Sequence, residues 1–190
     1  MSKNFETKLS EWRKLSEEKL VDYKIFSIYR CRFENVTQRK AGDFFLVECD
    51  DCVQVIAETT DGRIVMVEQY RFGLESFSLE LPGGRMDAGE KAIEAGRREL
   101  EEETGFCGGE AEVIAELYPN PAMQTNVVNV VLIRGCRKEL DTHFDEFEDL
   151  ATSLITREEL VNIVRSGRLS NCITMASIMR YILREQDHWR

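Results

Sequence analysis

Three consecutive glutamates, Glu101, Glu102 and Glu103, stand at the end of a predicted helix, just before a Thr-Gly pair that resembles a helix stop. The carboxyl end of a helix carries partial negative charge, so each acidic side chain there costs about 0.3 to 1 kcal/mol. On a helix, Glu99 shares a face with Glu102 at i+3 and Glu103 at i+4, so their carboxylates converge. This placement opposes local stability and therefore indicates a role in chemistry.

The converging carboxylates suit a hard divalent cation. Mg2+ and Mn2+ prefer oxygen ligands and retain several waters, and a bound cation would reverse the repulsion between the glutamates. The preceding segment Leu-Pro-Gly-Gly, residues 81–84, allows backbone to pass close by, and a carbonyl of Gly83 or Gly84 could complete the coordination. The same glycines would also serve a simple turn before the helix.

Part of the acidic charge has a simpler explanation. Arg97 can pair with Glu101 at four-residue spacing, so we interpret Glu101 as a solvated surface residue. Glu99 and Glu103 have no matching base. These two are therefore the stronger candidates for a metal site.

The elements that position these residues follow from the hydrophobic pattern. Residues 5–22 place apolar side chains at helical spacing and predict a short amphipathic helix. From Tyr23 onward, strands are predicted at residues 23–33, 43–49, 52–59 and 63–72, with Asp61-Gly62 as a hairpin turn between the last two.

The helix with the glutamates is predicted over residues 88–104, with Asp87 as its N-cap and Gly105 as its end. Two further strands are predicted at residues 111–117 and 126–135. Two helices follow, one opened by a capping box of Thr156 and Glu159 and the other over residues 170–185. This order predicts a mixed α+β domain with helices against a sheet, preceded by a small N-terminal strand unit.

Length and composition limit the function classes. A chain of 190 residues is long enough for one well-buried domain, and it has no apolar run that could cross a membrane or act as a signal peptide, which favours the cytoplasm. The net charge of −10 disfavours binding to nucleic acid or to anionic membranes. A phosphate substrate would therefore need a cation to meet it.

The cysteines are interpreted as buried thiols, because they are scattered through predicted strands and helices. Cys49 and Cys52 form a CxxC pair, but a structural zinc site needs two further ligands. The two histidines, His143 and His188, stand in unrelated surroundings. A zinc site is not expected.

The glycines, glutamates and arginine around the predicted helix together form a specific pattern. The pattern begins at Gly84, and Glu90 follows after five variable residues. After seven more variable residues come Arg98-Glu99-Leu100, then Glu102-Glu103 and Gly105-Phe106, each separated from the preceding group by one variable residue. At every defined position this matches the Nudix box, and the sequence resembles a Nudix hydrolase. The resemblance implies an α/β/α sandwich with a mixed sheet, and hydrolysis of a nucleoside diphosphate linked to another moiety.

The resemblance also implies roles for the residues of the box. Glu99 and Glu103 correspond to the principal ligands of Mg2+, with Mn2+ as the alternative ion. Glu102 corresponds to a further ligand or a catalytic carboxylate that orients water, and the Gly83 carbonyl to a backbone ligand. Structural roles fall to four other positions: Gly84, Glu90, Arg98 and Gly105.

Residues outside the box resemble one branch of the family. The segments EQYRFG at residues 68–73 and LELPGG at residues 79–84, with Pro121, are similar to ADP-ribose pyrophosphatases and nucleotide-sugar hydrolases. Arg71 and Glu80 in these segments are candidate substrate-binding residues. Arg71 would hold a phosphate or a terminal ribose, or else form a surface salt bridge.

The branch further implies a homodimer. Its N-terminal strands swap or pack across the dimer, so residues 1–50 are expected to be a helix-and-strand unit for dimerisation and residues 51–190 the Nudix hydrolase domain. A catalytic carboxylate is expected on the acidic loop at residues 144–150, with Glu146 as first choice for the general base and Glu148 second. The alternative for either is a solvated acidic loop.

The resemblance is compatible with several substrates. The leading hypothesis is Mg2+-dependent cleavage of ADP-ribose or a related nucleoside diphosphate sugar to a nucleoside monophosphate and a sugar phosphate. A dinucleoside polyphosphate, coenzyme A or an oxidised nucleotide is the second enzymatic alternative, because the stretch NPAMQTNV differs from the loop of well-marked ADP-ribose enzymes. A nucleotide-sugar sensor that binds without cleaving is the third.

Overall fold

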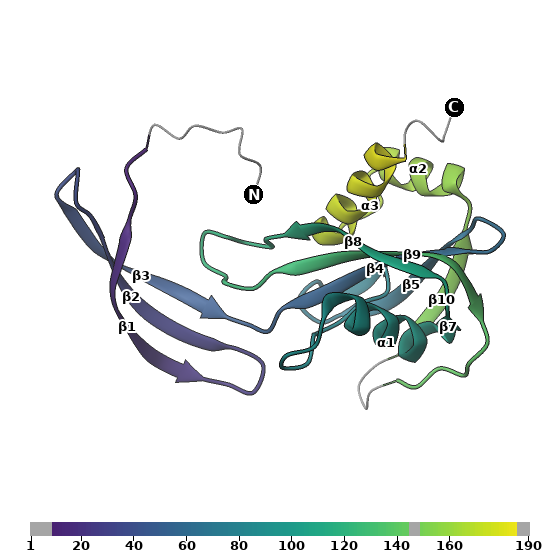
Figure 1. The fold of residues 1–190 in the computed structure, drawn as a ribbon, viewed down its shortest axis with the longest axis horizontal. Coiled ribbons are helices and arrows are strands. Elements are labelled where there is room, and N and C mark those ends of the chain that lie inside the picture. The colour runs from purple at the N-terminus through teal and green to yellow at the C-terminus, as the bar shows by residue number, and fades with distance from the viewer. Residues whose placement is uncertain (1–8, 145–148, 186–190) are drawn as a thin grey trace. The chain divides into compact units, whose positions relative to one another are not determined.

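A computed structural model describes residues 9–144 and 149–185 of the chain. The chain divides into two compact units, one of Met1–Cys49 with Asn120–Asn126 and the other of Asp50–Pro119 with Val127–Arg190. The elements of both units are labelled in Figure 1.

The N-terminal unit is an antiparallel sheet in the order β1-β2-β3. Its strands are β1 (Arg13–Asp22), β2 (Ser27–Asn35) and β3 (Lys40–Glu48). The loop 120–126 joins this unit, because the Val47 backbone donates to the Met123 carbonyl and accepts from the Thr125 N–H, at 2.7 and 3.2 Å.

The helix predicted over residues 5–22 is wrong in its described part, where β1 runs instead. Helix-forming Lys, Glu and Leu dominate this segment, but intrinsic propensity is a weak preference that pairing with a neighbouring strand can override. β1 pairs with β2 from Arg13–Glu34 to Asp22–Ser27, and the Arg13 guanidinium lies 2.9 Å from the Glu34 carboxylate. Leu15 and Leu20 stay exposed, so the helical spacing marks no buried face.

The second unit contains a seven-stranded mixed sheet in the order β10-β5-β4-β9-β7, with β6 added beside β5 and β8 beside β9. The β4–β9 pair is parallel and the remaining pairs are antiparallel. Its strands are β4 (Cys52–Thr59), β5 (Ile64–Arg71), β6 (Ser76–Glu80), β7 (Phe106–Cys107), β8 (Glu110–Leu117), β9 (Val128–Lys138) and β10 (Leu150–Ile155). The predicted hairpin turn is confirmed at Gly62, whose N–H donates to the Thr59 carbonyl at 2.9 Å.

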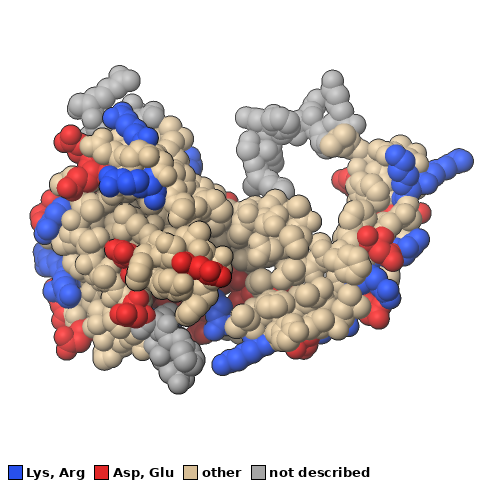
Figure 2. Space-filling view, turned by 180° about the vertical axis from the view of Figure 1, so that it is seen from behind, with Lys and Arg blue, Asp and Glu red and all other residues tan. Residues whose placement is uncertain are grey.

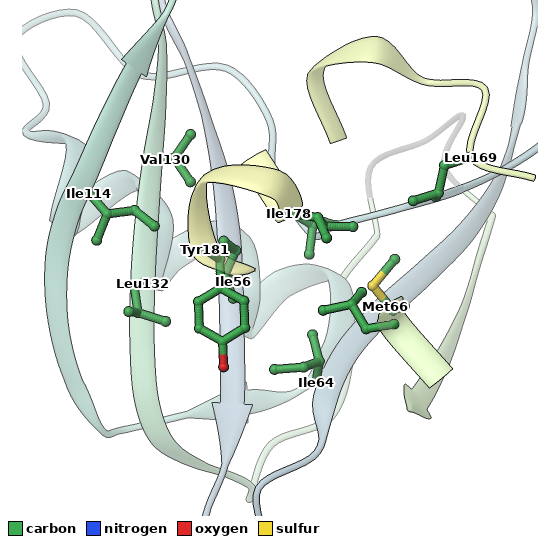
Figure 3. Close-up of a cluster of buried hydrophobic side chains, with 11 residues drawn as sticks. Ile56, Ile64, Met66, Ile114, Val130, Leu132, Leu169, Ile178 and Tyr181 are labelled. Carbon is green, nitrogen blue, oxygen red and sulfur yellow. The ribbon is translucent and has the colours of Figure 1, made fainter. Parts of the chain in front are cut away.

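Helices cover both faces of this sheet. α1 (Ala92–Thr104) lies on one face, and α2 (Arg157–Arg165) and α3 (Cys172–Arg184) lie on the other (Figure 1). Alternation along β4 and β9 supplies both cores, because neighbouring strand residues point to opposite faces. The α1 core includes Val55, Ala57, Leu100, Val131 and Ile133. The α3 core includes Ile56, Ile64, Leu132, Ile178 and Tyr181, whose ring lies among the aliphatic side chains (Figure 3).

The helix ends explain the position of the glutamates. α1 begins after Lys91, so the predicted N-cap at Asp87 is wrong; Gly89, with φ of 80°, turns the chain between Asp87 and the helix. Gly105 ends the helix as predicted, in the left-handed conformation with φ of 71°. The capping box of Thr156 and Glu159 at the start of α2 is confirmed.

All six cysteines are free. The expectation of buried thiols is confirmed for Cys31 and Cys136 and is wrong for Cys172, which is exposed at the start of α3. Burial raises the pKa of the Cys136 thiol to about 11.

In Figure 2 the acidic and basic side chains of the described residues lie close to one another on each unit, with uncharged surface between the charged groups. Such mixing, with a net charge of −10, provides no broad cationic surface on the face shown for a polyanion. Within the described residues, no helix combines the length and apolar character needed to cross a membrane.

Candidate active site

A cavity of about 630 Å³ lies where the C-terminal half of α1 meets the glycine-containing loop after β6. It combines the carboxylates of the predicted metal site with arginine side chains. The residues that line it include Gln69, Arg71, Gly83, Gly84, Arg98, Glu99, Glu102, Glu103 and His143. The structure therefore brings most of the predicted site residues together.

Glu103 is buried, with an exposed fraction of 3%, and is held against the loop. Its Oε2 accepts a hydrogen bond from the Gly83 N–H at 2.9 Å. Gly83 has φ of 153°, and a Cβ at this position would lie 2.2 Å from the Val53 carbonyl oxygen. Glycine is needed here because the loop passes directly over β4.

Glu99 occupies the space beside the next glycine. A Cβ at Gly84 would lie 2.5 Å from Glu99 Oε1 and 2.6 Å from Glu99 Oε2. Gly84 therefore forms a recess that holds this carboxylate.

Arg98 connects the helix to the loop and to two of the carboxylates. Its Nε and Nη2 donate to Glu90, each at 3.0 Å, and Nη2 also donates to the Arg85 carbonyl at 2.9 Å. Its Nη1 lies 2.9 Å from Glu99 Oε1 and 3.0 Å from Glu102 Oε2. These hydrogen bonds raise the pKa of Arg98 and lower that of Glu90. The expectation that Glu99 lacks a matching base is wrong.

The arrangement is compatible with a divalent cation but is not a preformed metal cage. Among residues 9–144 and 149–185, no group of three or more His, Cys, Asp or Glu side chains is placed to hold a metal ion. Arg98 Nη1 instead contacts both Glu99 and Glu102, and the Glu103 carboxylate accepts the Gly83 N–H. Three carboxylates from one helical turn, with a recess at Gly84, still provide the oxygen donors that Mg2+ and Mn2+ prefer.

Arg71 enters the cavity lining from the end of β5 and is oriented by Glu80. The pair is bidentate, with Arg71 Nε and Nη2 at 2.9 and 2.7 Å from the Glu80 carboxylate oxygens. Burial of Glu80, 1% exposed, opposes its ionisation, but hydrogen bonds from Arg71, Ser78 and Asn171 hold the pKa of this carboxyl below its usual range. Glu80 is thus placed to position Arg71, and Arg71 faces the cavity.

Arg97 does not form the predicted pair with Glu101. Its guanidinium donates instead to the Gly108 and Gly109 carbonyls at 3.1 and 2.8 Å. Glu101 lines a neighbouring cavity that shares Arg98, Glu102 and His143 with the carboxylate site, but Glu101 does not line the carboxylate site itself. Its assignment as the member of the triplet outside the carboxylate site stays a prediction.

His143 is a site residue that sequence reasoning missed. It follows β9 by five positions and lines the same cavity as Glu99 and Glu103. No local spacing connects it to the Nudix box, so only the fold reveals its position. Glu146 and Glu148, the candidate general bases, lie outside the described residues.

Comparison with known proteins identifies the family. Residues 50–171 match the NUDIX domain, which is more than half of the chain. The chain belongs to the Nudix family. The Nudix box thus coincides with α1 and its preceding loop, and the predicted sandwich with an N-terminal strand unit is confirmed.

This Nudix protein is similar in sequence to proteins from several bacteria. An ADP-ribose pyrophosphatase of Bacillus subtilis is 30% identical over 180 residues, covering 92% of this chain and 95% of that protein. A methanol dehydrogenase activator of Bacillus methanolicus is 30% identical, and the match covers 74% of this chain and 76% of that protein. An ADP-ribose pyrophosphatase of Mycobacterium tuberculosis is 31% identical, with coverage of 70% and 66%.

A crystal structure of an ADP compounds hydrolase shares the fold. It superposes with a TM-score of 0.82 at 19% identity, covering 96% of this chain and 98% of the other. Taken with the sequence relatives, the chain is a Nudix pyrophosphohydrolase that is similar to ADP-ribose pyrophosphatases.

Proposed function

We propose that this Nudix protein is a Mg2+-dependent hydrolase of ADP-ribose or a related nucleoside diphosphate sugar, releasing a nucleoside monophosphate and a sugar phosphate. The observation that carries the proposal is the cavity in which Glu99, Glu102 and Glu103 face the same space as Arg71. Two relatives named ADP-ribose pyrophosphatases support the substrate class.

The carboxylates would hold the cation. Glu99 and Glu103 are the principal ligands in this proposal, with Glu102 and the Gly83 carbonyl beside them, and Mn2+ could replace Mg2+. A bound divalent ion supplies Lewis acidity and lowers the pKa of water. Arg98 must then share Glu99 and Glu102 with the ion, while its two hydrogen bonds to Glu90 keep it anchored to the loop.

Arg71 would bind the diphosphate. A guanidinium presents paired donors that match phosphate oxygens, and preorganisation by a buried carboxylate reduces the entropy lost on binding. Glu80 supplies that preorganisation through its bidentate contact. A phosphate held here would lie in the same cavity as the carboxylates.

The reaction that follows is attack of water on one phosphorus of the diphosphate. The bond from that phosphorus to the bridging oxygen breaks, and the bridging oxygen leaves on the second phosphate. A carboxylate base accepts the proton of the attacking water. Glu146, with Glu148 second, remains the predicted base.

We also propose a cytoplasmic homodimer formed through residues 1–50, with residues 51–190 as the hydrolase domain. An apolar groove of about 370 Å³ on the N-terminal unit supports the dimer; it is lined by Trp12, Phe33, Phe44, Leu46 and Ala122. Exposed aromatic surface of this kind often marks a protein interface. Six free cysteines are in keeping with a reducing compartment.

Product identification by mass tests the function. The purified protein is incubated in Mg2+ with ADP-ribose, ADP-glucose, GDP-mannose, UDP-glucose, diadenosine polyphosphates and coenzyme A. Cleavage confined to nucleotide sugars, giving nucleoside monophosphate and sugar phosphate, is expected. Preferred cleavage of coenzyme A or a diadenosine polyphosphate would contradict the substrate class, and binding without product would indicate a sensor.

A further inference from the structure

We infer that His143 is a diphosphate-binding residue of this site, donating a hydrogen bond from its imidazole to a phosphate oxygen of the substrate. The inference rests on the proposed function and adds a residue to it. His143 lines the cavity together with Arg71 and the glutamates of α1, although it comes from a loop far from both in the sequence.

The loop that carries His143 is fixed by the end of α1. The N–H groups of Glu139 and Leu140 both donate to the Gly105 carbonyl at 3.1 Å, and the His143 N–H donates to the Glu102 carbonyl at 2.8 Å. The last carbonyls of a helix have no partner within the helix, so this loop satisfies acceptors that would otherwise need water.

Gly105 makes the close approach possible. A Cβ at this position would lie 2.2 Å from the Leu140 carbonyl oxygen, and the residue already has a left-handed backbone. The glycine that ends α1 therefore also seats the loop on the helix.

The attachment fixes His143 relative to the metal-site carboxylates. Glu102 contributes its side chain to the cavity and accepts the His143 N–H at its backbone carbonyl, so the backbone of His143 is tied to the helical turn that carries the carboxylates. A ligand phosphate near the carboxylates would therefore meet the histidine at a defined position. Such preorganisation is what a binding residue requires.

The charges in the cavity show why a further donor is useful. Its three arginines are each engaged by carboxylates: Arg71 by Glu80, Arg98 by three glutamates, and Arg85 by Asp50 at 3.3 Å. The His143 ring forms no ion pair and no hydrogen bond with any other described residue. An imidazole can donate whether neutral or protonated, so it can serve a phosphate without a carboxylate partner.

Calorimetry and kinetics on two variants test the assignment. His143→Ala removes the donor and His143→Gln keeps an N–H donor of similar reach, while Thr142→Ala is a matched control in the same loop. The probes are α,β-methylene-ADP for the diphosphate, Mn2+ alone for the metal site, and ADP-ribose with Mg2+ for turnover. Thermal unfolding of each variant checks that the fold is intact.

We expect His143→Ala to weaken binding of α,β-methylene-ADP about tenfold or more and to raise KM for ADP-ribose, because a hydrogen bond to a charged group is lost. His143→Gln should recover part of the affinity, and Mn2+ binding and Tm should match those of the wild type. Wild-type binding of α,β-methylene-ADP by His143→Ala would overturn the inference, as would a loss of Mn2+ affinity or a failure of the wild type to bind the probe. If the wild type binds the probe but cleaves no nucleotide sugar, the proposed function fails while the binding comparison still decides the role of His143.

Discussion

The glutamates near the C-terminal end of α1 contact different groups of the protein. Glu103 accepts a hydrogen bond from the Gly83 N–H, and Glu102 accepts one from Arg98. Glu99 lies in the recess at Gly84. The helix end tolerates these glutamates because Arg98 and a backbone N–H offset their repulsion before any cation binds.

Replacing Glu103 tests its role as a metal ligand. Glu103→Gln keeps an oxygen that can accept from the Gly83 N–H but removes the charge, so we expect turnover of ADP-ribose to fall about 100-fold or more with little change in Tm. Steady-state kinetics and Mn2+ titration measure the effect. Glu101→Ala is the control and should retain activity; equal losses in the two variants would contradict the division of roles.

Gly84 offers a second test that leaves every carboxylate in the chain. Gly84→Ala places a methyl group where the Glu99 carboxylate lies, and the flexible side chain must move. We predict about 10- to 100-fold weaker Mn2+ binding, in line with other changes that disturb ligand orientation. Unchanged Mn2+ affinity in a folded Gly84→Ala protein would show that the recess does not hold Glu99 for the metal.

Elements of the second unit were largely predictable because their patterns are local. The buried runs of β4, β5 and β9, the Gly105 helix end and the α2 capping box all lie close to where the sequence predicts them. The Nudix box itself fixed the helix that carries the carboxylates. Most candidate site residues could therefore be named in advance.

Other elements depend on distant partners and could not be read locally. β1 is stabilised as a strand by its pairing with β2. β10 (Leu150–Ile155) is short and is stabilised by its pairing with β5. β6 reverses the usual pattern, since it buries Ser78 and Glu80 and exposes Phe77. The buried Glu80 is compensated by its bidentate contact with Arg71, a residue of the neighbouring strand β5. His143 likewise reaches the site only through the fold.

The capping box of α2 gives a prediction at the scale of an element. Thr156 accepts from the Glu159 N–H at 3.1 Å, and Glu159 Oε2 accepts from the Thr156 N–H at 2.7 Å. Thr156→Ala should lower the free energy of unfolding by about 1 kcal/mol, whereas Thr156→Ser should lower it much less. Urea denaturation measures both. kcat should not change, because α2 covers the sheet face opposite α1; a loss of turnover in folded Thr156→Ala would contradict this.

The whole second unit is stabilised by buried polar contacts as well as by its two apolar cores. Gln54 on β4 donates to Thr174 at 2.9 Å and accepts from Ser177 at 3.0 Å, and the Tyr181 hydroxyl donates to Glu58 at 2.9 Å. These contacts fix α3 on the sheet. The contact between Arg71 and the buried Glu80 belongs to the same class and links stability to the site.

Stability should therefore depend on pH through Glu80. Its folded pKa lies below the ordinary value of 4.5, so its contribution is fully present above about pH 4.5 and is lost as the pH falls through the folded pKa. Urea denaturation of the wild type and Glu80→Gln between pH 3 and 7, a range chosen to bracket the ordinary carboxyl pKa, measures the linkage. The variant should be less stable at pH 7, with a shallower loss toward acid. Parallel curves would exclude Glu80 as a source of the dependence.

The proposed homodimer can be tested at the same scale. Charge substitution in the apolar groove, as in Phe44→Glu, should shift sedimentation equilibrium toward monomer because an ion would be buried without a partner. Arg32→Glu, at a salt-bridged and solvent-exposed position of the same sheet, is the control for altered charge. A wild-type protein that sediments as a monomer at micromolar concentration would contradict the proposal.

The proposed function requires that water cleaves the diphosphate of a nucleotide sugar at the carboxylate site of α1. Incubation of the wild type with ADP-ribose and Mg2+ in ¹⁸O-labelled water, followed by mass spectrometry of the products, tests it most directly. We expect AMP and ribose 5-phosphate, with one ¹⁸O atom in only one of them per turnover, and no such products from Glu103→Gln. Intact ADP-ribose after prolonged incubation, or products cleaved outside the diphosphate, would contradict it.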